Sequence, residues 1–495
     1  MTLFPMDDMT DDAHADHGYT VRAGPRDWTL HVGDSREMMR LLPDASVDSC
    51  VCDPPYELGF MGKAWDATGI AYDVGLWREV LRVLKPGGHL LAFGGTRTHH
   101  RMACAIEDAG FAIRDMMAWA YSTGFPKSLD VSKAIDAQVL TGKTNSRAIR
   151  VAKDAREVVG TKMGRPGNSA GQVPRCGGFS RATKSINSGV DIENEDERLG
   201  ASLAEGGHRR DMDITKPKTE QAKQWQGWGT ALKPAWEPIC VARKPLAGTV
   251  AQNVIAHGTG ALNVDACRVG TEEPRPALEH TGLTGNVYGA GIEGSRSIGD
   301  TMLGRWPANI LHDGSADVLA CFPQSNGQQG NVRGTEPSST FGGVACGPAS
   351  GRHPQQARGD AGSAARFFYC AKTSTWERNA GCLHLPARTG AEAVDRDEDS
   401  AGVDNPRAGA GRKAQAVHNF HPTVKPVDLM RYMVTLVTPV GGLVLDPFAG
   451  SGSTGCGAML AGCRFHGIEL DTAHAVIAHA RITWWERHAR HHAKD

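Results

Sequence analysis

The sequence predicts an α/β protein whose central sheet is assembled from both ends of the chain. Strand-like and helix-like segments alternate over residues 27–121, which is typical of a parallel, doubly wound sheet. A second unit of strand, loop, helix and strand lies at 443–471, and the chain ends 24 residues after Asp471. This second unit is too short to complete a sheet alone, so we expect it to join the first. The long stretches between them are rich in glycine and predict loop-rich insertions.

Each expected element has a local reason. Four apolar segments read as strands, "WTLHVGD", "SVDSCVC", "HLLAFGG" and "FAIRDMMAWAY", and segments with helical spacing alternate with them, "SREMMRLLP", "VGLWREVLRVLKPGG" and "RMACAIEDAG". Gly87 and Gly88 follow the second helix and are expected to cap it. A further strand is expected in "LKPAWEPICVARKPL", and the helix "PVDLMRYMVTLVTP" leads into the last strand pair.

Composition limits the functional classes. A chain of 495 residues with a net charge of −1 and a pI of about 7 is not a polycation, so any nucleic-acid surface must be local. We find no apolar stretch of about 18 residues and no signal peptide, which predicts a soluble, cytoplasmic protein with no membrane partner. The twelve cysteines form no C-x-x-C pair, which favours reduced thiols. The histidines of "THHRMAC" and "RHARHHAKD" lack a second ligand pair, so no metal site is expected.

The composition changes along the chain and suggests domain boundaries. Residues 142–184 contain ten Lys or Arg against two acids. This region predicts a solvated, partly disordered insertion, although a basic, Gly-rich loop is also typical of an arm that follows DNA. The expected units are a flexible N-terminus (1–26), a first half of the core (27–122), the basic insertion (123–225), a core strand (226–246), a second loop-rich region (247–415) and a second half of the core (416–495).

The segment "DPPY" (Asp53, Pro54, Pro55, Tyr56) ends the second strand. Two successive prolines remove two backbone donors and fix two φ angles, so the ladder stops at Cys52. One interpretation is a strand that merely ends at a proline turn. The other is a pocket for a flat group carrying N–H donors.

The segment "LVLDPFAGSGSTG" places Gly450, Gly452 and Gly455 between a strand and a helix, and Glu469 follows at the end of the next strand. This pattern also fits a dinucleotide-binding oxidoreductase. A carboxylate at the strand end, Asp446, suits a cofactor with an ammonium group better than a pyrophosphate. S-adenosylmethionine meets these requirements: Glu469 would bind the ribose, and Asp34, at the end of "LHVGD", would accept from the adenine amine. A P-loop is excluded because no Lys-Ser/Thr follows the glycines.

Three motifs in this order, "DPPY", "HPTVKP" (421–426) and "DPFAGSGSTG" (446–455), resemble the β-group of DNA amino-methyltransferases, most closely its phage- and prophage-type modification methylases. The resemblance covers about 27–128, 228–246 and 416–485. It implies a Rossmann-like methyltransferase sheet that uses S-adenosyl-L-methionine and acts on double-stranded DNA in a bacterial or phage-infected cell. It also implies that 27–122 is the catalytic half of the core, 247–415 the target-recognition region and 416–495 the cofactor-binding half. It is also compatible with a homodimer and with a cognate restriction endonuclease.

The resemblance implies a role for each motif residue. Asp53 and the Pro54 carbonyl would accept the two N–H bonds of an exocyclic amine, Pro55 would keep the turn rigid, and Tyr56 would stack on the flipped base. Trp236 is expected either to oppose Tyr56 or to pack in the core, and Lys127 either to touch a phosphate or to be an ordinary exposed lysine. The cofactor would be held at its carboxylate by Thr423 and Lys425, at its amino group by Asp446, and around its methionine and ribose by Phe448, Ala449, Gly450, Ser451 and Gly452.

Three alternatives stay open from the sequence. Family members with Asp at the first position of the turn mostly modify adenine N6, which favours adenine, and those with Ser mostly modify cytosine N4. A non-catalytic DNA-binding protein on the same scaffold is the second alternative, although Asp53, Tyr56, Asp446 and Glu469 are all retained. The oxidoreductase is the third.

Overall fold

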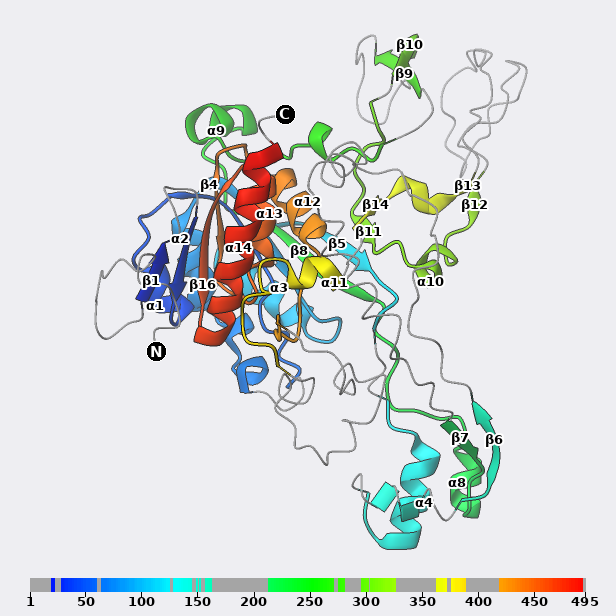
Figure 1. The fold of residues 1–495 in the computed structure, drawn as a ribbon. Helices are drawn as coiled ribbons and strands as arrows, with labels where there is room; N and C mark the ends of the chain where they lie inside the picture. Colours follow the sequence, from blue (N-terminus) through cyan, green and yellow to red (C-terminus); the bar gives the residue numbers. More distant parts are fainter. Residues whose placement is uncertain are drawn as a thin grey trace, which may run out of the picture.

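Strands from both ends of the chain form one ten-stranded sheet in the computed structural model (Figure 1). Its order is β1-β2-β16-β15-β3-β4-β8-β5-β11-β14. The strands are β1 (Tyr19–Arg22), β2 (Trp28–Val32), β3 (Val47–Cys52), β4 (Leu84–Phe93), β5 (Ala112–Ala120), β8 (Trp236–Arg243), β11 (Ile310–His312), β14 (Tyr369–Cys370), β15 (Leu443–Asp446) and β16 (Arg464–Glu469). The structure describes residues 19–22, 28–59, 64–124, 128–144, 148–149, 151–152, 156–162, 212–270, 275–280, 295–301, 303–325, 362–371, 375–388 and 418–492. The prediction of a sheet assembled from both ends is confirmed.

The sheet is mixed, whereas the sequence predicted a parallel one. Strands β2, β16, β15, β3 and β4 are parallel, but β8 runs antiparallel to both β4 and β5. The reason lies at the ends of the insertion: the Tyr121 N–H, just after β5, donates to the Ala235 carbonyl, just before β8, at 2.9 Å. Because the chain leaves and re-enters the sheet at the same edge, β8 must run opposite to β5.

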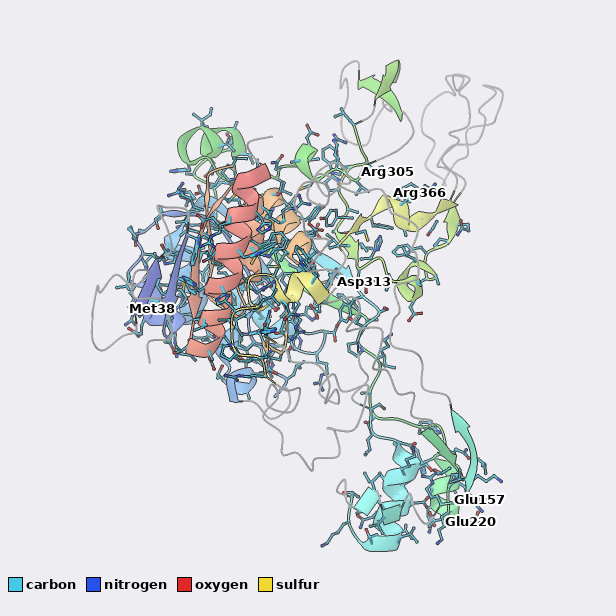
Figure 2. The ribbon with its side chains drawn as sticks, viewed as in Figure 1. Met38, Glu157, Glu220, Arg305, Asp313 and Arg366 are labelled. Atoms are coloured by element: carbon cyan, nitrogen blue, oxygen red, sulfur yellow. The ribbon has the colours of Figure 1, made fainter. Side chains whose placement is uncertain are left out.

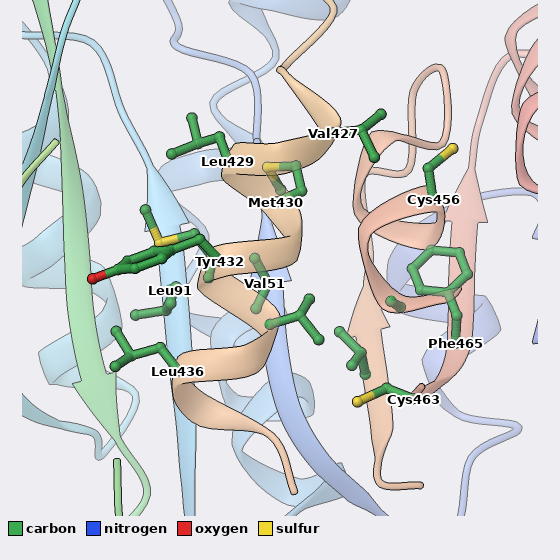
Figure 3. Packing of buried hydrophobic residues seen from close by; sticks show 14 of the residues in the cluster. Val51, Leu91, Val427, Leu429, Met430, Tyr432, Leu436, Cys456, Cys463 and Phe465 are labelled. Carbon is green, nitrogen blue, oxygen red and sulfur yellow. The ribbon is translucent and has the colours of Figure 1, made fainter. Parts of the chain in front are cut away.

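Helices cover both faces of the sheet. One face carries α1 (Ser35–Met39), α2 (Val74–Val83) and α3 (His99–Asp108), and the other carries α12 (Val427–Val437), α13 (Ser453–Leu460) and α14 (Thr472–His492). Residues of β3 alternate between the two cores, Val51 with the second set and Cys50 and Cys52 with the first. Figure 3 shows α12 with Val51 of β3 and Leu91 of β4 behind it and Cys456 of α13 beside it. Each such fully buried aliphatic side chain contributes about 1.5–3 kcal/mol.

Gly87 does not cap α2, contrary to the sequence prediction. The helix ends at Val83, and β4 begins at Leu84, so Gly87 lies within the strand with φ at +76°. A Cβ there would lie 2.4 Å from the Asn253 side-chain nitrogen. Glycine is therefore required by a left-handed conformation and by the close approach of Asn253, at the point where the β3–β4 register shifts.

The basic insertion contains a small ordered unit, which sequence patterning did not predict. It consists of α4 (Val131–Thr141), β6 (Val158–Lys162), β7 (Met212–Thr215) and α8 (Glu220–Gln224), and Figure 2 labels Glu157 and Glu220 within it. The buried Asp136 accepts from the backbone N–H of Lys218 and Thr219, each at 2.9 Å, and pairs with Arg156 at 3.5 Å. A buried ionic contact, which leaves no hydrophobic periodicity, therefore ties these elements together. Most of the basic run lies outside the described residues.

The region 247–415 contributes strands to the same sheet. Beyond β5, the strands β11 and β14 continue it in parallel, and Arg305, Asp313 and Arg366 lie in the segments around them (Figure 2). The other elements here are α9 (Val250–His257), the hairpin of β9 (Arg275–His280) and β10 (Ser295–Thr301), α10 (Ala316–Leu319), the pair β12 (Gln324–Ser325) and β13 (Gly362–Ser363), and α11 (Thr375–Asn379). Across the described segments, no helix combines the length and apolar character needed to cross a membrane.

Candidate active site

Four of the predicted site residues follow or end neighbouring parallel strands. Asp34 follows β2, Glu469 ends β16, Asp446 ends β15, and Asp53 follows β3. These strands are adjacent and parallel in this order, so their carboxyl ends share one edge of the sheet. In α/β sheets this edge is where ligands bind. The fold therefore places the proline turn and the glycine loop side by side.

Lys425 lies at the centre of the proline turn. Its ammonium contacts three oxygens: Asp53 Oδ2 at 2.7 Å, the Tyr56 hydroxyl at 3.1 Å and Glu237 Oε2 at 3.2 Å. The contacts with Asp53 and Tyr56 are hydrogen bonds, and the contact with Glu237 is an ion pair. Lys425 precedes α12, which packs against β3 and β4, and this packing brings the lysine to the end of β3.

The second carboxylate oxygen of Asp53 has no such partner. Asp53 Oδ1 is buried, and within the described part of the chain no hydrogen bond reaches it. A buried acceptor without a partner costs about 1–3 kcal/mol. Such an atom at a strand end marks a place for a donor that the protein itself does not supply.

The charges of this group keep Tyr56 protonated and Lys425 charged. Burial, with the Asp53 and Glu237 carboxylates, raises the pKa of Tyr56 well above its ordinary value. Burial alone would lower the pKa of Lys425, but the same two carboxylates outweigh it and leave that pKa raised. Tyr56 is therefore a neutral phenol that donates to Glu237 Oε2 at 3.0 Å.

The chain after the turn is held by two side chains. Thr98 Oγ1 donates to the Tyr56 carbonyl at 2.7 Å, and the carboxylate of the buried Asp66 accepts from the N–H of Glu57 and Leu58 at 3.0 and 3.2 Å. Glu57 has φ at +53°, a left-handed conformation that a non-glycine residue adopts at a cost of about 1–3 kcal/mol. The Thr98 hydroxyl and the Asp66 carboxylate keep the turn in this conformation.

The two acids beside the glycine loop, Asp446 and Glu469, accept hydrogen bonds from groups of residues 448–454. Asp446 accepts from the Phe448 N–H at 2.9 Å and from the Thr454 hydroxyl at 2.5 Å. Burial raises the pKa of Asp446 to about 7, against the lowering effect of these two hydrogen bonds and with a contribution from the Asp53 and Glu469 charges. Glu469 accepts from the Gly450 N–H at 2.7 Å. Both acids thus shape the loop in the absence of a ligand.

Two glycines of the loop are required by its geometry. Gly450 and Gly452 have φ at +53° and +75°. A Cβ on Gly450 would lie 2.9 Å from His421 Nε2, and one on Gly452 would lie 3.0 Å from Cα of Ala478 in α14. The loop is therefore pressed against α14 and the "HPTVKP" segment.

Arg481 of α14 donates hydrogen bonds to this loop. Its side chain is fully buried, and Nη1 donates to the Ser451 carbonyl at 2.7 Å, to Ser451 Oγ at 3.0 Å and to Ser453 Oγ at 3.1 Å. The other two guanidinium nitrogens have no hydrogen-bond partner among the residues the structure describes. A single nitrogen of this arginine therefore carries all its contacts to the loop.

Other predicted residues lie at the margins of the site. Both carboxylate oxygens of Asp34 bond to Arg36, at distances from 2.8 to 3.1 Å, and Asp34 caps α1; this lowers its pKa. Thr423 is exposed, with its backbone bonded to the His421 ring. Trp236 is the first residue of β8 and pairs with Ala120, and its neighbour Glu237 is the one that reaches Lys425. Lys127 lies outside the described residues.

Sequence reasoning missed Glu237, Arg481, Asp66 and Thr98. For Glu237 a signal existed: it is the one acid in the otherwise apolar strand "WEPICVA", and a lone acid in a buried strand usually has a specific partner. The other three residues had no local signal. In the described part of the chain, no group of three or more His, Cys, Asp or Glu residues could hold a metal ion.

Comparisons with known proteins show the family of the chain. The family model described as DNA methylase, of the N6/N4 type, matches residues 47–479. The type II methyltransferase M2.DpnII of Streptococcus pneumoniae is 42% identical over 71 residues, which cover 14% of this chain and 26% of that protein. The DNA adenine methyltransferase YhdJ of Escherichia coli (strain K12) is 39% identical over 62 residues, covering 12% and 21%. The matched segments thus span about a quarter of these curated relatives or less.

Solved structures give similar matches over greater lengths. The cytosine-N4-specific PvuII DNA methyltransferase covers 94% of each chain at 11% identity, with a TM-score of 0.36. The M1.HpyAVI–SAM complex covers 92% of this chain and 98% of that one at 10% identity, with a TM-score of 0.31. The family model spans both the proline turn and the glycine loop. The chain therefore belongs to the family of N6/N4 DNA methylases.

Proposed function

We propose that this protein is a site-specific DNA methyltransferase that transfers a methyl group from S-adenosylmethionine to the exocyclic N6 of adenine. The observation that carries the proposal is Asp53 Oδ1, a buried acceptor without a partner among the described residues, beside the neutral ring of Tyr56. An exocyclic amine on a flat base supplies the missing donor. Family membership supports the same chemical class.

The turn would activate a weak nucleophile. The lone pair of an exocyclic amine is delocalised into the base, so the nitrogen must be drawn towards a pyramidal geometry before it reacts. Asp53 Oδ1 and the Pro54 carbonyl would accept its two N–H bonds, and Lys425 holds the other Asp53 oxygen at 2.7 Å. Acceptors that are already fixed favour the positive charge that develops on nitrogen. As the new N–C bond forms and the methyl–sulfur bond of the cofactor breaks, which leaves S-adenosylhomocysteine, Asp53 Oδ1 would take the proton that the nitrogen loses.

S-adenosylmethionine, when bound, supplies a sulfonium methyl group as the electrophile. The residues present fit it: the Asp446 carboxylate suits an ammonium, Glu469 suits the ribose hydroxyls, and the loop of Phe448, Ala449, Gly450, Ser451 and Gly452 offers backbone close to both. Because the Lys425 ammonium already contacts Asp53, Tyr56 and Glu237, we assign Lys425 to the turn. This leaves Thr423 as the "HPTVKP" residue for the cofactor carboxylate. Asp34, although bonded to Arg36, is at the right edge for the adenine amine.

A base in duplex DNA must leave the helix to reach Asp53, at a cost of a few kcal/mol. Stacking on Tyr56 would recover on the order of 1–3 kcal/mol. Trp236 is our candidate for a second contact, although strand alternation directs it away from the face that Glu237 occupies. We propose that the target sequence is read by residues of 247–415, some of which extend the sheet beside the site through β11 and β14. A homodimer and a cognate endonuclease are further proposals that rest on the resemblance alone.

The test uses tritiated S-adenosylmethionine and unmethylated plasmid DNA, followed by nucleoside digestion and mass spectrometry. Wild type is compared with Asp53→Ala and with Asp44→Ala, which removes an exposed aspartate outside the site. We expect N6-methyladenine from wild type and from Asp44→Ala, and a loss of about a thousandfold or more in Asp53→Ala. N4-methylcytosine would correct the base and keep the mechanism. Cofactor binding without any methylated nucleoside would favour a non-catalytic DNA-binding protein.

A further inference from the structure

We propose that Glu237 is a positioning residue for the methyl-transfer site: it engages the protons of Lys425 and Tyr56 that would otherwise turn to Asp53 Oδ1. The inference rests on the proposed function. It concerns a residue that lies in none of the three sequence motifs and reaches the site from β8, the antiparallel strand of the sheet.

The contacts of Glu237 connect the whole cluster. Its Oε2 lies 3.0 Å from the Tyr56 hydroxyl, which donates to it, and 3.2 Å from Lys425 Nζ. The same ammonium bonds Asp53 Oδ2 at 2.7 Å. The side chains are largely buried, with 16% of Glu237 and 8% of Lys425 exposed. Two carboxylates therefore share one ammonium, and Asp53 Oδ1 is buried without a hydrogen-bond partner among the described residues.

Competition for Asp53 is the first reason to assign this role. Tyr56 is a neutral phenol, and a buried hydroxyl requires an acceptor. If Glu237 were absent, the nearest remaining carboxylate for the Tyr56 proton and for the third Lys425 proton would be Asp53. Either contact would occupy the oxygen that the amine needs. By accepting from both groups, Glu237 keeps Asp53 Oδ1 free.

Net charge is the second reason. With Asp53 and Glu237 ionised and Lys425 protonated, the cluster carries one negative charge, whereas the Asp53–Lys425 pair alone would be neutral. Positive charge develops on the attacking nitrogen, and in a buried site a nearby negative charge stabilises it more strongly than in water. Tyr121 also lies close to Glu237, since burial and that carboxylate raise the Tyr121 pKa, so a second phenol adds to the demand on this acid.

The test compares Glu237→Gln and Glu237→Asp with wild type on plasmid DNA. Glu237→Gln keeps the shape but loses the charge and one acceptor, and Glu237→Asp keeps the charge. Glu79→Gln is the matched control, because Glu79 pairs with Arg82 on the surface of α2 at 2.9 Å. For each variant, kcat, KM for DNA, Kd for S-adenosylhomocysteine and Tm are measured.

We expect Glu237→Gln to lower kcat by about 10- to 100-fold, with Kd, KM and Tm close to wild type, and Glu237→Asp to retain more activity. Tyr56→Phe in the Glu237→Gln background should recover part of kcat, because the competing phenol proton is gone. A purely structural role predicts no such recovery.

Three results would overturn the inference: kcat of Glu237→Gln within about twofold of wild type, a loss that follows Tm, or no recovery from Tyr56→Phe. Each of these leaves the proposed function intact as long as wild type methylates DNA. An inactive wild type that binds S-adenosylhomocysteine would instead overturn the proposed function, and this inference with it.

Discussion

The proline turn and the glycine loop lie at the same edge of the sheet but are held together in opposite ways. The acids of the glycine loop bond within their own segment: Asp446 to Phe448 and Thr454, and Glu469 to Gly450. Asp53 and Tyr56 of the turn bond to groups far away in the sequence, Lys425 and Glu237. The acids of the loop are thus held by groups nearby in the sequence, with Arg481 of α14 as a more distant contact to Ser451 and Ser453. The turn is completed only where three distant segments meet.

This difference predicts which property of the enzyme a mutation in each region changes. A change in the glycine loop should act mainly on cofactor binding, because the loop makes none of the contacts of Asp53, Tyr56 or Lys425 described above. A change at Lys425 should act on the turn, although Lys425 belongs to the "HPTVKP" segment beside the loop. Mutations in the glycine loop and at Lys425 should therefore separate effects on cofactor affinity from effects on kcat.

The largest effect is expected from Lys425→Met. It leaves the buried Asp53 and Glu237 carboxylates without their shared cation, and removing one partner of a buried ion pair costs about 3–5 kcal/mol. We expect kcat to fall by about 100- to 10,000-fold, with Kd for S-adenosylhomocysteine changed less than tenfold. Single-turnover methylation and calorimetric binding measure the two effects.

Lys425→Arg is the control for charge, because it keeps the cation but changes its shape. We expect it to recover stability more than rate, since a planar guanidinium cannot place three protons as the ammonium does. If Lys425→Met instead raised Kd for S-adenosylhomocysteine steeply and kept kcat, Lys425 would belong to the cofactor carboxylate, and the contrast between the two regions would fail.

A smaller effect, on cofactor binding by the glycine loop, is expected from Arg481→Met. This loses the contacts of Nη1 to Ser451 and Ser453, so the loop should loosen and the Kd for S-adenosylhomocysteine should rise about tenfold, which corresponds to about 1.4 kcal/mol. Saturating cofactor should restore kcat.

Arg481→Lys sharpens this test. Since one guanidinium nitrogen makes all the described contacts to the loop, an ammonium can replace it, and Kd should stay within about threefold of wild type. An equal loss in both variants would show that the two uncontacted nitrogens matter. An unchanged Kd in Arg481→Met would show that the loop holds its shape without α14.

The sequence predicted local features well for a physical reason. The strand that ends at Asp53, the glycine loop with its required Gly450 and Gly452, and the acid at Glu469 are set by neighbours in the chain, and turn chemistry and spacing reveal them. The contact of Lys425 with Asp53 depends on how α12 packs over β3, and the spacing of residues in the sequence does not indicate this packing. The resemblance to DNA amino-methyltransferases identified Lys425 as a site residue but assigned it to the cofactor carboxylate and not to Asp53.

The antiparallel strand shows the same limit. An apolar strand between prolines was visible at β8, but its direction depended on the Tyr121–Ala235 contact across the insertion. Glu237 was visible as a lone acid, yet only the register of β8 between β4 and β5 brings it to Tyr56. The ordered unit around Asp136 was hidden because a buried ion pair leaves no periodic pattern.

The smallest expected effect is a dependence on pH that belongs to the glycine loop alone. The native Asp446 carboxyl keeps its proton up to about pH 7, against an ordinary value of 3.8. Between these values the native state binds more protons than the unfolded state, so the stability it contributes is present at low pH and is lost as pH rises towards 7. An ammonium ligand favours the ionised carboxyl, so the affinity for S-adenosylhomocysteine should rise with pH by up to about tenfold per unit below pH 7.

Asp446→Asn should remove this slope in both stability and affinity while weakening binding at pH 8, and urea unfolding and calorimetry from pH 5 to 8 measure the two. Any slope that persists in the variant comes from the ligand's own amine. If wild type and Asp446→Asn showed the same slope, Asp446 would be ionised throughout and serve only to close the loop through Phe448 and Thr454. In that case the cofactor ammonium would need another partner, and cofactor binding would depend on an acid or carbonyl other than Asp446.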